Sequence, residues 1–91
     1  MAYSVELAPA AKRQVRKLDR AIQERIIRRL EALGKDPRPP GVEKLEGVES
    51  TYRVRLGEYR IVYEIQDKIL VVLVLKVGHR KEIYRGPGQV K

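Results

Sequence analysis

The fold follows from one segment, TYRVRLGEYRIVYEI, which spans Thr51–Ile65. Side chains alternate between the two faces of a β-strand, so the segment predicts strands that are apolar on one face and basic on the other. Gly57-Glu58 divides the two runs. Glycine at the first central position favours a two-residue type II′ turn. The segment is therefore predicted to be a β-hairpin.

The predicted turn also sets the register of the hairpin. It places Arg55 directly opposite Arg60, with Arg53 on the same face, and it aligns the apolar side chains on the other face. Like charges directly opposite each other are destabilising. A face of three arginines therefore predicts a polyanionic ligand, and nucleic acid fits. The alternative is that these arginines only keep the surface soluble.

Helices are predicted before the hairpin. Tyr3–Leu7 alternates apolar and polar residues, which indicates a first short strand. Pro9 suits the first turn of a helix, Asp19 suits the N-cap of a second, and Gly34 suits the C′ position that ends it. The two helices are joined almost without a loop, so both apolar stripes are expected to face one sheet.

A central strand is predicted after the hairpin, over Ile69–Val77, because ILVVLVLKV is apolar on both faces apart from Lys76. Gly78 is predicted to end it. The fold class is α+β: an N-terminal strand, a two-helix hairpin and a three-stranded antiparallel meander, with the helices on one face of the sheet. Residues 1–91 are expected to form a single domain, with a flexible tail over 86–91.

Composition restricts the classes of function. The chain has 91 residues, 20 Lys or Arg and 12 Asp or Glu, and a net charge of +8, which favours nucleic acid, an anionic membrane surface or an acidic protein partner. It has no cysteine and one histidine, which excludes disulfides and zinc sites built on several thiolates or imidazoles. No secretory signal or membrane span stands out, so a soluble, cytoplasmic protein is expected.

The candidate site joins the three hairpin arginines to Arg80 and Tyr84, beyond the central strand. The planar fork of arginine donates two parallel hydrogen bonds to phosphate, and several arginines can stabilise the charge that develops when a phosphodiester is cleaved. Tyr84 can stack on a base or take part in proton transfer. His79, the single imidazole, is the alternative acid or base, but strand alternation places it on the side opposite Arg80 if the strand continues that far. No cofactor is expected.

Four stretches resemble the RelE/ParE toxin superfamily of bacterial and archaeal toxin–antitoxin pairs, and together they cover nearly the full chain. They are AYSVELAPAAKRQVRKL, KLEG at Lys44–Gly47, YRVRLGEYRIVYEI and VLKVGHRKEIYR. The chain looks most similar to the RelE branch, whose members cut mRNA in the ribosomal A site without a metal, by attack of a 2′-OH on the adjacent phosphate. They are neutralised by a RelB-like antitoxin.

The resemblance implies a role for each candidate residue. Arg53 and Arg55 match residues that hold the RNA and assist proton transfer at the 2′-OH. Arg60 matches an arginine that binds the scissile phosphate, Arg80 one that stabilises the transition state and leaving group, and Tyr84 a tyrosine that stacks on or orients the nucleotide. At the first two positions, however, RelE-like proteins have lysine, and arginine is a poor proton carrier because it stays charged.

The resemblance also implies partners: a cognate RelB-like antitoxin in a hetero-oligomer, the small ribosomal subunit with its A site, and mRNA, with no membrane. Two alternatives remain. One is a ParE-like toxin that inhibits DNA gyrase and cleaves nothing, since a shared fold does not determine function. The other is a degenerate module that only binds its antitoxin. The presence of both Arg80 and Tyr84 favours the nuclease.

Overall fold

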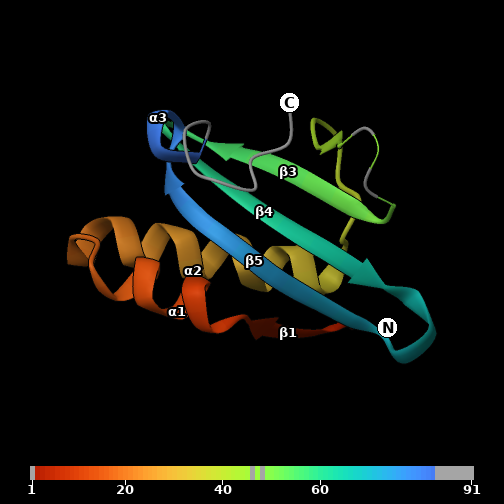
Figure 1. The fold of residues 1–91 in the computed structure, drawn as a ribbon. Coiled ribbons are helices and arrows are strands. Elements are labelled where there is room, and N and C mark those ends of the chain that lie inside the picture. Colours follow the sequence, from red (N-terminus) through yellow and green to blue (C-terminus); the bar gives the residue numbers. More distant parts are fainter. Residues whose placement is uncertain (1, 46, 48, 84–91) are drawn as a thin grey trace.

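A computed structural model describes residues 2–45, 47 and 49–83. Its five strands form one sheet in the order β1-β5-β4-β3-β2, and α1 and α2 lie together on one face of it (Figure 1). The elements are β1 (Ser4–Leu7), α1 (Pro9–Arg16), α2 (Arg20–Lys35), β2 (Glu43–Lys44), β3 (Thr51–Leu56), β4 (Tyr59–Gln66), the 3₁₀ helix η1 (Asp67–Ile69), β5 (Val71–His79) and α3 (Arg80–Ile83).

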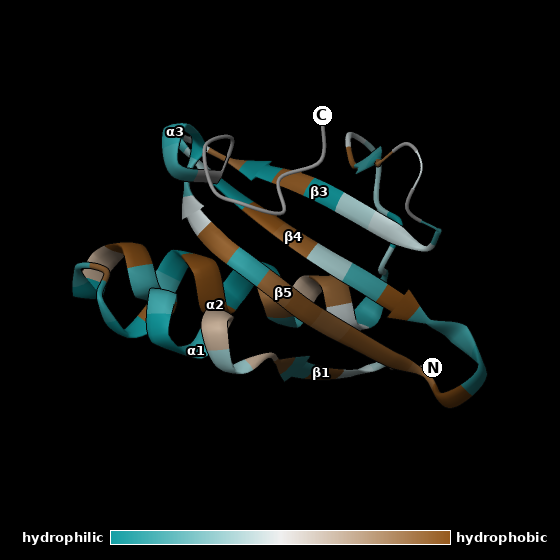
Figure 2. Ribbon diagram, in the orientation of Figure 1, coloured by the Kyte–Doolittle hydropathy of each residue, from teal (hydrophilic) through white to brown (hydrophobic). Residues whose placement is uncertain are grey.

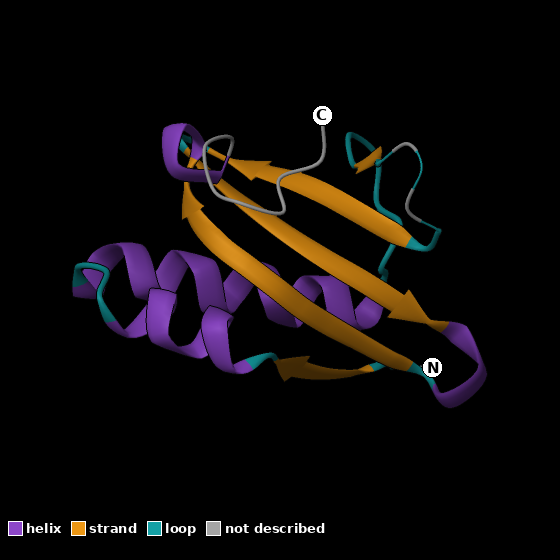
Figure 3. Ribbon diagram, viewed as in Figure 1, coloured by secondary structure: helices purple, strands orange, loops and turns teal. Residues whose placement is uncertain are grey.

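The sheet is mixed: β1 runs parallel to β5, and the other neighbouring strands are antiparallel. The predicted α+β class and the helices on one face are confirmed. Strand β2 was not predicted, because it begins in the connector of residues 34–43, which is rich in proline and glycine (Figure 3). The predicted tail, 86–91, lies outside the described residues.

The hairpin has the predicted register. Arg55 lies opposite Arg60 and Leu56 lies opposite Tyr59. Gly57 has a φ of 61°, the positive value that a type II′ turn requires at its first central residue. The alternation of the two strands therefore places the arginines on the face of the sheet that α1 and α2 do not cover.

The core lies between the helices and the other face of the sheet. Its helix side chains are Ala11, Ile26, Leu30 and Leu33, and its sheet side chains are Val54, Ile61, Tyr63, Ile65, Val72, Val74 and Val77. Figure 2 shows that β5 is hydrophobic along most of its length, as expected of a strand with neighbours on both edges. The predicted apolar stripes of both helices therefore do face one sheet.

The bounds predicted for the central strand were wrong at both ends. Ile69 ends η1, and Leu70 adopts a left-handed conformation with φ 57°, so β5 begins only at Val71. These residues make the reversal from β4 into β5. At the other end the strand continues through Gly78, which is buried and lies opposite Arg60. Gly78 therefore lies within β5 and does not end it.

The role predicted for Gly34 was also wrong. Helix α2 continues to Lys35, and Gly34 is buried inside its last turn. A Cβ atom at this position would lie 3.0 Å from Cγ2 of Val5 and 3.1 Å from the carbonyl oxygen of Tyr3. The N–H of Tyr3 also donates a 2.7 Å hydrogen bond to the carbonyl of Gly34. The glycine therefore allows the chain entering β1 to pack directly on α2.

Asp19 does occupy the N-cap position of α2, but its side chain makes no capping hydrogen bond.

Replacement of Gly34 by Ala is expected to destabilise the protein by about 1 kcal/mol or more, measured by urea unfolding. Overpacking costs about 1–3 kcal/mol, and the gain in helix propensity of about 1 kcal/mol offsets only part of this. The backbone of Tyr3 has little freedom to withdraw, because its N–H is bound to α2. A more stable Gly34→Ala variant would contradict the close packing.

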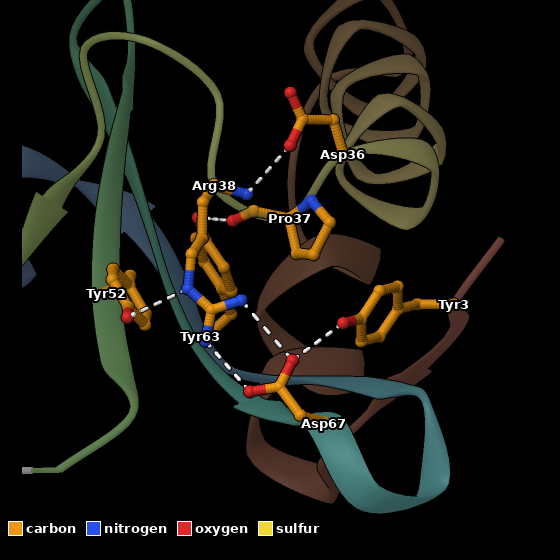
Figure 4. A network of polar contacts seen from close by, with 7 residues as sticks. All are labelled: Tyr3, Asp36, Pro37, Arg38, Tyr52, Tyr63 and Asp67. Atoms are coloured by element: carbon orange, nitrogen blue, oxygen red, sulfur yellow. Dashed lines mark hydrogen bonds and ion pairs between the residues drawn. The ribbon is translucent and has the colours of Figure 1, made fainter. Parts of the chain in front are cut away.

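A polar network ties the connector after α2 to the sheet (Figure 4). The guanidinium of Arg38 donates to both carboxylate oxygens of Asp67, at 2.9 and 3.3 Å, and to the hydroxyl of Tyr52 at 3.2 Å. The hydroxyl of Tyr3 donates to Asp67 at 2.6 Å. The hydrogen bond from Arg38 holds the pKa of Asp67 below its usual range. Residues far apart in the chain thus meet at one carboxylate.

Tyr63 lies beneath this network and is fully buried. Its hydroxyl donates a 2.7 Å hydrogen bond to the carbonyl of Pro37, and its ring stacks on that of Tyr52 with centroids 5.9 Å apart. Burial raises the pKa of Tyr63 to about 12. The neutral phenol is therefore favoured in the folded protein.

Tyr63→Phe is expected to lower the free energy of unfolding at pH 7 by about 1–2 kcal/mol, because the carbonyl of Pro37 loses its donor. The pKa of Tyr63 is about 12 in the folded protein and about 10 in the unfolded chain. The stability that this difference contributes is fully present below pH 10 and is lost as the pH rises towards about 12. The stability difference between the two proteins should therefore shrink from pH 10 to pH 12 in urea unfolding. A difference that stays constant over this range would contradict the assignment.

Candidate functional site

The open face of the sheet carries the arginines predicted from the hairpin. Arg53 and Arg55 come from β3, and Arg60 comes from β4. Arg55 and Arg60 are register partners, so their Cα atoms lie directly opposite each other. The structure thus brings these three residues onto one face, but it gives each a different environment.

Arg53 is paired with a carboxylate that sequence reasoning missed. Its Nε donates to Oε1 of Glu43 at 3.1 Å, and its Nη2 contacts the same oxygen. Glu43 lies opposite Arg53 because β2 pairs with β3. The hydrogen bond with Arg53, together with the charges of Arg55 and Arg60, holds the pKa of Glu43 below its usual range. The only sequence signal was one acidic residue in the connector, which gave no reason to expect a strand.

Arg55 and Arg60 differ most in exposure. Arg55 is exposed and makes no hydrogen bond within the described ranges. The side chain of Arg60 is buried, with 7% of the residue exposed, and its Nη1 donates to the carbonyls of Gly57 and Tyr59, both at 3.0 Å. Arg60 thus lies on the face that the register predicts, but it is buried there and not exposed. Its guanidinium holds the backbone of the hairpin turn.

Arg80 reaches the same turn from the end of β5. Its Nε lies 3.1 Å from Oε1 of Glu58, and its backbone N–H donates to the carbonyl of Glu58 at 2.8 Å. About half of the side chain, 51%, is exposed. The two Nη atoms of Arg80 donate no hydrogen bond to any described residue. They are therefore available to an anion.

His79 lies beside Arg80 rather than on the opposite side, because β5 ends at His79 and α3 begins at the next residue. Its Nε2 is 3.9 Å from Oε1 of Glu58, and its ring packs edge-on against Tyr59 with centroids 5.7 Å apart. Its Nδ1 accepts a 3.2 Å hydrogen bond from the N–H of Lys81. The two residues were expected on opposite sides only if the strand continued, and it ends at His79.

The Gly57-Glu58 turn is the point where these groups meet. It is bound by Arg60 through backbone carbonyls and by Arg80 through the carboxylate of Glu58. Tyr84, the remaining predicted site residue, lies outside the described residues. In the part of the chain that the structure covers, no group of three or more His, Cys, Asp or Glu could hold a metal ion. The site can act through fixed positive charge and N–H donors.

A second basic region lies on the helices and reaches the hairpin turn, where Nη2 of Arg25 lies 3.6 Å from the position that a Cβ atom would take on Gly57. The outer faces of α1 and α2 are mostly basic, and a shallow pocket between α2 and β3 is lined by Arg25, Arg28, Arg29, Ala32 and Leu56. The sequence favours a solvated helix face here, and no contact in the structure assigns it another role. None of the described helices combines the length and the apolar character needed to cross a membrane.

Comparisons with known proteins agree on one family. Residues 5–84 match the family described as the ParE toxin of the type II toxin-antitoxin system, parDE. The chain is 33% identical over 88 residues to the mRNA interferase toxin RelE of Escherichia coli K12, and the match covers 92% of each chain.

Two solved complexes contain a similar fold. One is the intact RelBE toxin–antitoxin complex of E. coli, with a TM-score of 0.77, 31% identity and coverage of 86% of this chain and 96% of that one. The other is the archaeal RelE–RelB complex of Pyrococcus horikoshii OT3, with a TM-score of 0.77, 32% identity and coverage of 88% and 97%.

Proposed function

The chain belongs to the RelE-like branch of the RelE/ParE toxin superfamily, and we propose that it is the toxin of a type II toxin–antitoxin pair that cleaves mRNA on the ribosome. The observation that carries the proposal is the gathering of Arg55, Arg60 and Arg80 around one rigid hairpin, with Arg53 beside them. The chain is also 33% identical to a protein named an mRNA interferase toxin.

The proposed reaction is metal-independent. The 2′-OH of one nucleotide loses its proton to water and attacks the adjacent phosphorus, and the bond from phosphorus to the 5′-oxygen breaks. The 5′-oxygen takes a proton from water, so a 2′,3′-cyclic phosphate and a 5′-OH form. The exposed Arg55 and the anchored Arg60 bind the phosphate, and Arg80 faces the leaving oxygen. Because arginine stays protonated, these residues act as charges and donors that stabilise the transition state, not as proton acceptors. Tyr84 is proposed to stack on the nucleotide.

The proposed partners follow from the same family. Solved RelB–RelE complexes support a RelB-like antitoxin that forms a hetero-oligomer with this chain. The net charge of +8 favours an acidic or amphipathic antitoxin segment that folds on binding. The substrate complex is mRNA in the A site of the small ribosomal subunit, so the protein would act in the cytoplasm.

The test is toeprinting on programmed ribosomes with the purified chain, in the absence of antitoxin. The wild type is expected to create a new mRNA 3′ end within the A-site codon, and Arg80→Ala is expected to slow cleavage by at least about 10²-fold, the usual cost of removing one transition-state donor. Arg80 is preferred to Arg60 here because the side chain of Arg60 is buried and holds two backbone carbonyls of the turn, whereas that of Arg80 is half exposed. Arg20→Ala is the matched control, since Arg20 is exposed on α2 and pairs only with Glu24 among the described residues.

A second candidate is inhibition of DNA gyrase, which the match to the ParE toxin family supports. Gyrase supercoiling assays with the same protein samples separate the two. Intact message together with inhibited supercoiling would replace the nuclease proposal by the gyrase one. Intact message and active gyrase would indicate a module that only binds its antitoxin.

A further inference from the structure

Glu58 occupies a position that the proposed reaction does not yet use. It is the second residue of the hairpin turn and is itself exposed, yet one of its carboxylate oxygens faces two cations or potential cations. That oxygen, Oε1, lies 3.1 Å from Nε of Arg80 and 3.9 Å from Nε2 of His79. A carboxylate in a site built to bind phosphate would compete with the substrate unless it has a separate task.

The contact is made at the inner end of the arginine. Oε1 of Glu58 approaches Nε of Arg80, and the two terminal Nη atoms donate no hydrogen bond within the described part of the chain. An arginine held in this way has lost side-chain freedom but retains the edge that binds two phosphate oxygens. The ion pair therefore orients Arg80 without occupying its phosphate-binding groups.

The turn is rigid enough to serve as a reference point. Gly57 has the positive φ of a tight two-residue turn, and Arg60 binds the carbonyls on both sides of Glu58, those of Gly57 and Tyr59. The N–H of Arg80 is bound to the carbonyl of Glu58. This backbone bond is independent of the Glu58 side chain. Changing the carboxylate should therefore leave the fold and the start of α3 in place.

We propose that Glu58 is a positioning residue for RNA cleavage: its carboxylate orients Arg80 so that the free edge of the guanidinium faces the leaving oxygen. The inference rests on the proposed function, since it gives Arg80 its role in the reaction. Glu58 itself touches no reacting atom. Glu58 acts through Arg80. Arg60 binds the backbone of the same turn, so the turn sets the position of Arg80 relative to Arg60.

The experiment measures single-turnover cleavage of mRNA on programmed ribosomes over a range of toxin concentrations. Glu58→Ala is expected to lower the maximal rate about 10-fold or more, since a small displacement of a catalytic group can cost about 10²-fold. The half-saturating concentration should stay within about two-fold, because the interaction matters only in the transition state. Glu58→Asp, which keeps the charge in a turn that tolerates aspartate, should recover most of the rate.

Two comparisons exclude a merely structural effect. In the Arg80→Ala background, Glu58→Ala should cause no further loss, because residues that act through one another are non-additive. Glu24→Ala removes an equal charge from an exposed arginine pair on α2 and should cleave like the wild type. Circular dichroism and thermal unfolding of each variant check that the fold is retained.

The outcomes separate this inference from the function on which it rests. A wild-type protein that leaves the message intact overturns both. If the wild type cleaves and Arg80→Ala does not, a Glu58→Ala variant with the wild-type rate overturns the inference alone. The inference is also overturned if the double variant loses as much cleavage rate as the product of the two single-variant losses. Glu58 would then not act through Arg80.

Discussion

The buried side chains of strand β4 determine which of its faces points into the core, and the positions of the candidate residues depend on this. Ile61, Tyr63 and Ile65 are almost completely buried against the helices, so their alternation determines which face of the strand points into the core. A slip of one residue would exchange the two faces and bring Arg60 into the core. Burial of the apolar side chains thus places Arg60 on the opposite face, where it faces Arg55.

The arginines on and beside this face would repel one another without nearby hydrogen-bond acceptors. The structure gives three of them an acceptor, and each acceptor is different. Arg53 has the carboxylate of Glu43, Arg80 has that of Glu58, and Arg60 has two backbone carbonyls. Arg55 has no hydrogen bond in the described part of the chain. The acceptors therefore orient three of the four guanidinium groups without neutralising the face. With a net charge of +8, the remaining field would draw an RNA backbone to it, more weakly at high salt.

Sequence reasoning works well here where a feature depends on neighbouring residues and poorly where it depends on packing. The hairpin, its turn and the Arg55–Arg60 pairing follow from a period of two and one glycine, and all are present. Gly34 and Gly78 were read as element ends because glycine often has that role. Both instead lie inside an element, Gly34 where the backbone of Tyr3 approaches closely and Gly78 opposite Arg60 in the sheet. Composition alone does not distinguish the two uses.

The same limit applies to the site. Arg53, Arg55, Arg60 and Arg80 could be identified from their residue type and spacing, but their acceptors could not. Glu43 reaches Arg53 because a two-residue strand forms in the connector, and Arg60 is buried with its guanidinium bound to two carbonyls of the hairpin turn. The network of Arg38 and Asp67 joins residues that no local pattern connects. The contacts of Glu43 and of Asp67 require the folded chain, since each is made by two segments distant in sequence.

The length of the hairpin turn is therefore a constraint on the site as well as on the fold. With two residues in the turn, Arg55 and Arg60 face each other, Arg60 reaches the carbonyls of Gly57 and Tyr59, and Glu58 lies beside Arg80. One added residue would require a different turn type, since a type II′ turn has two residues between a directly paired Leu56 and Tyr59. The carbonyls that hold Arg60 and the carboxylate that holds Arg80 would then move relative to each other. The turn thus couples an arginine of β4 to the arginine that follows β5, and the relative placement of the two depends on its geometry.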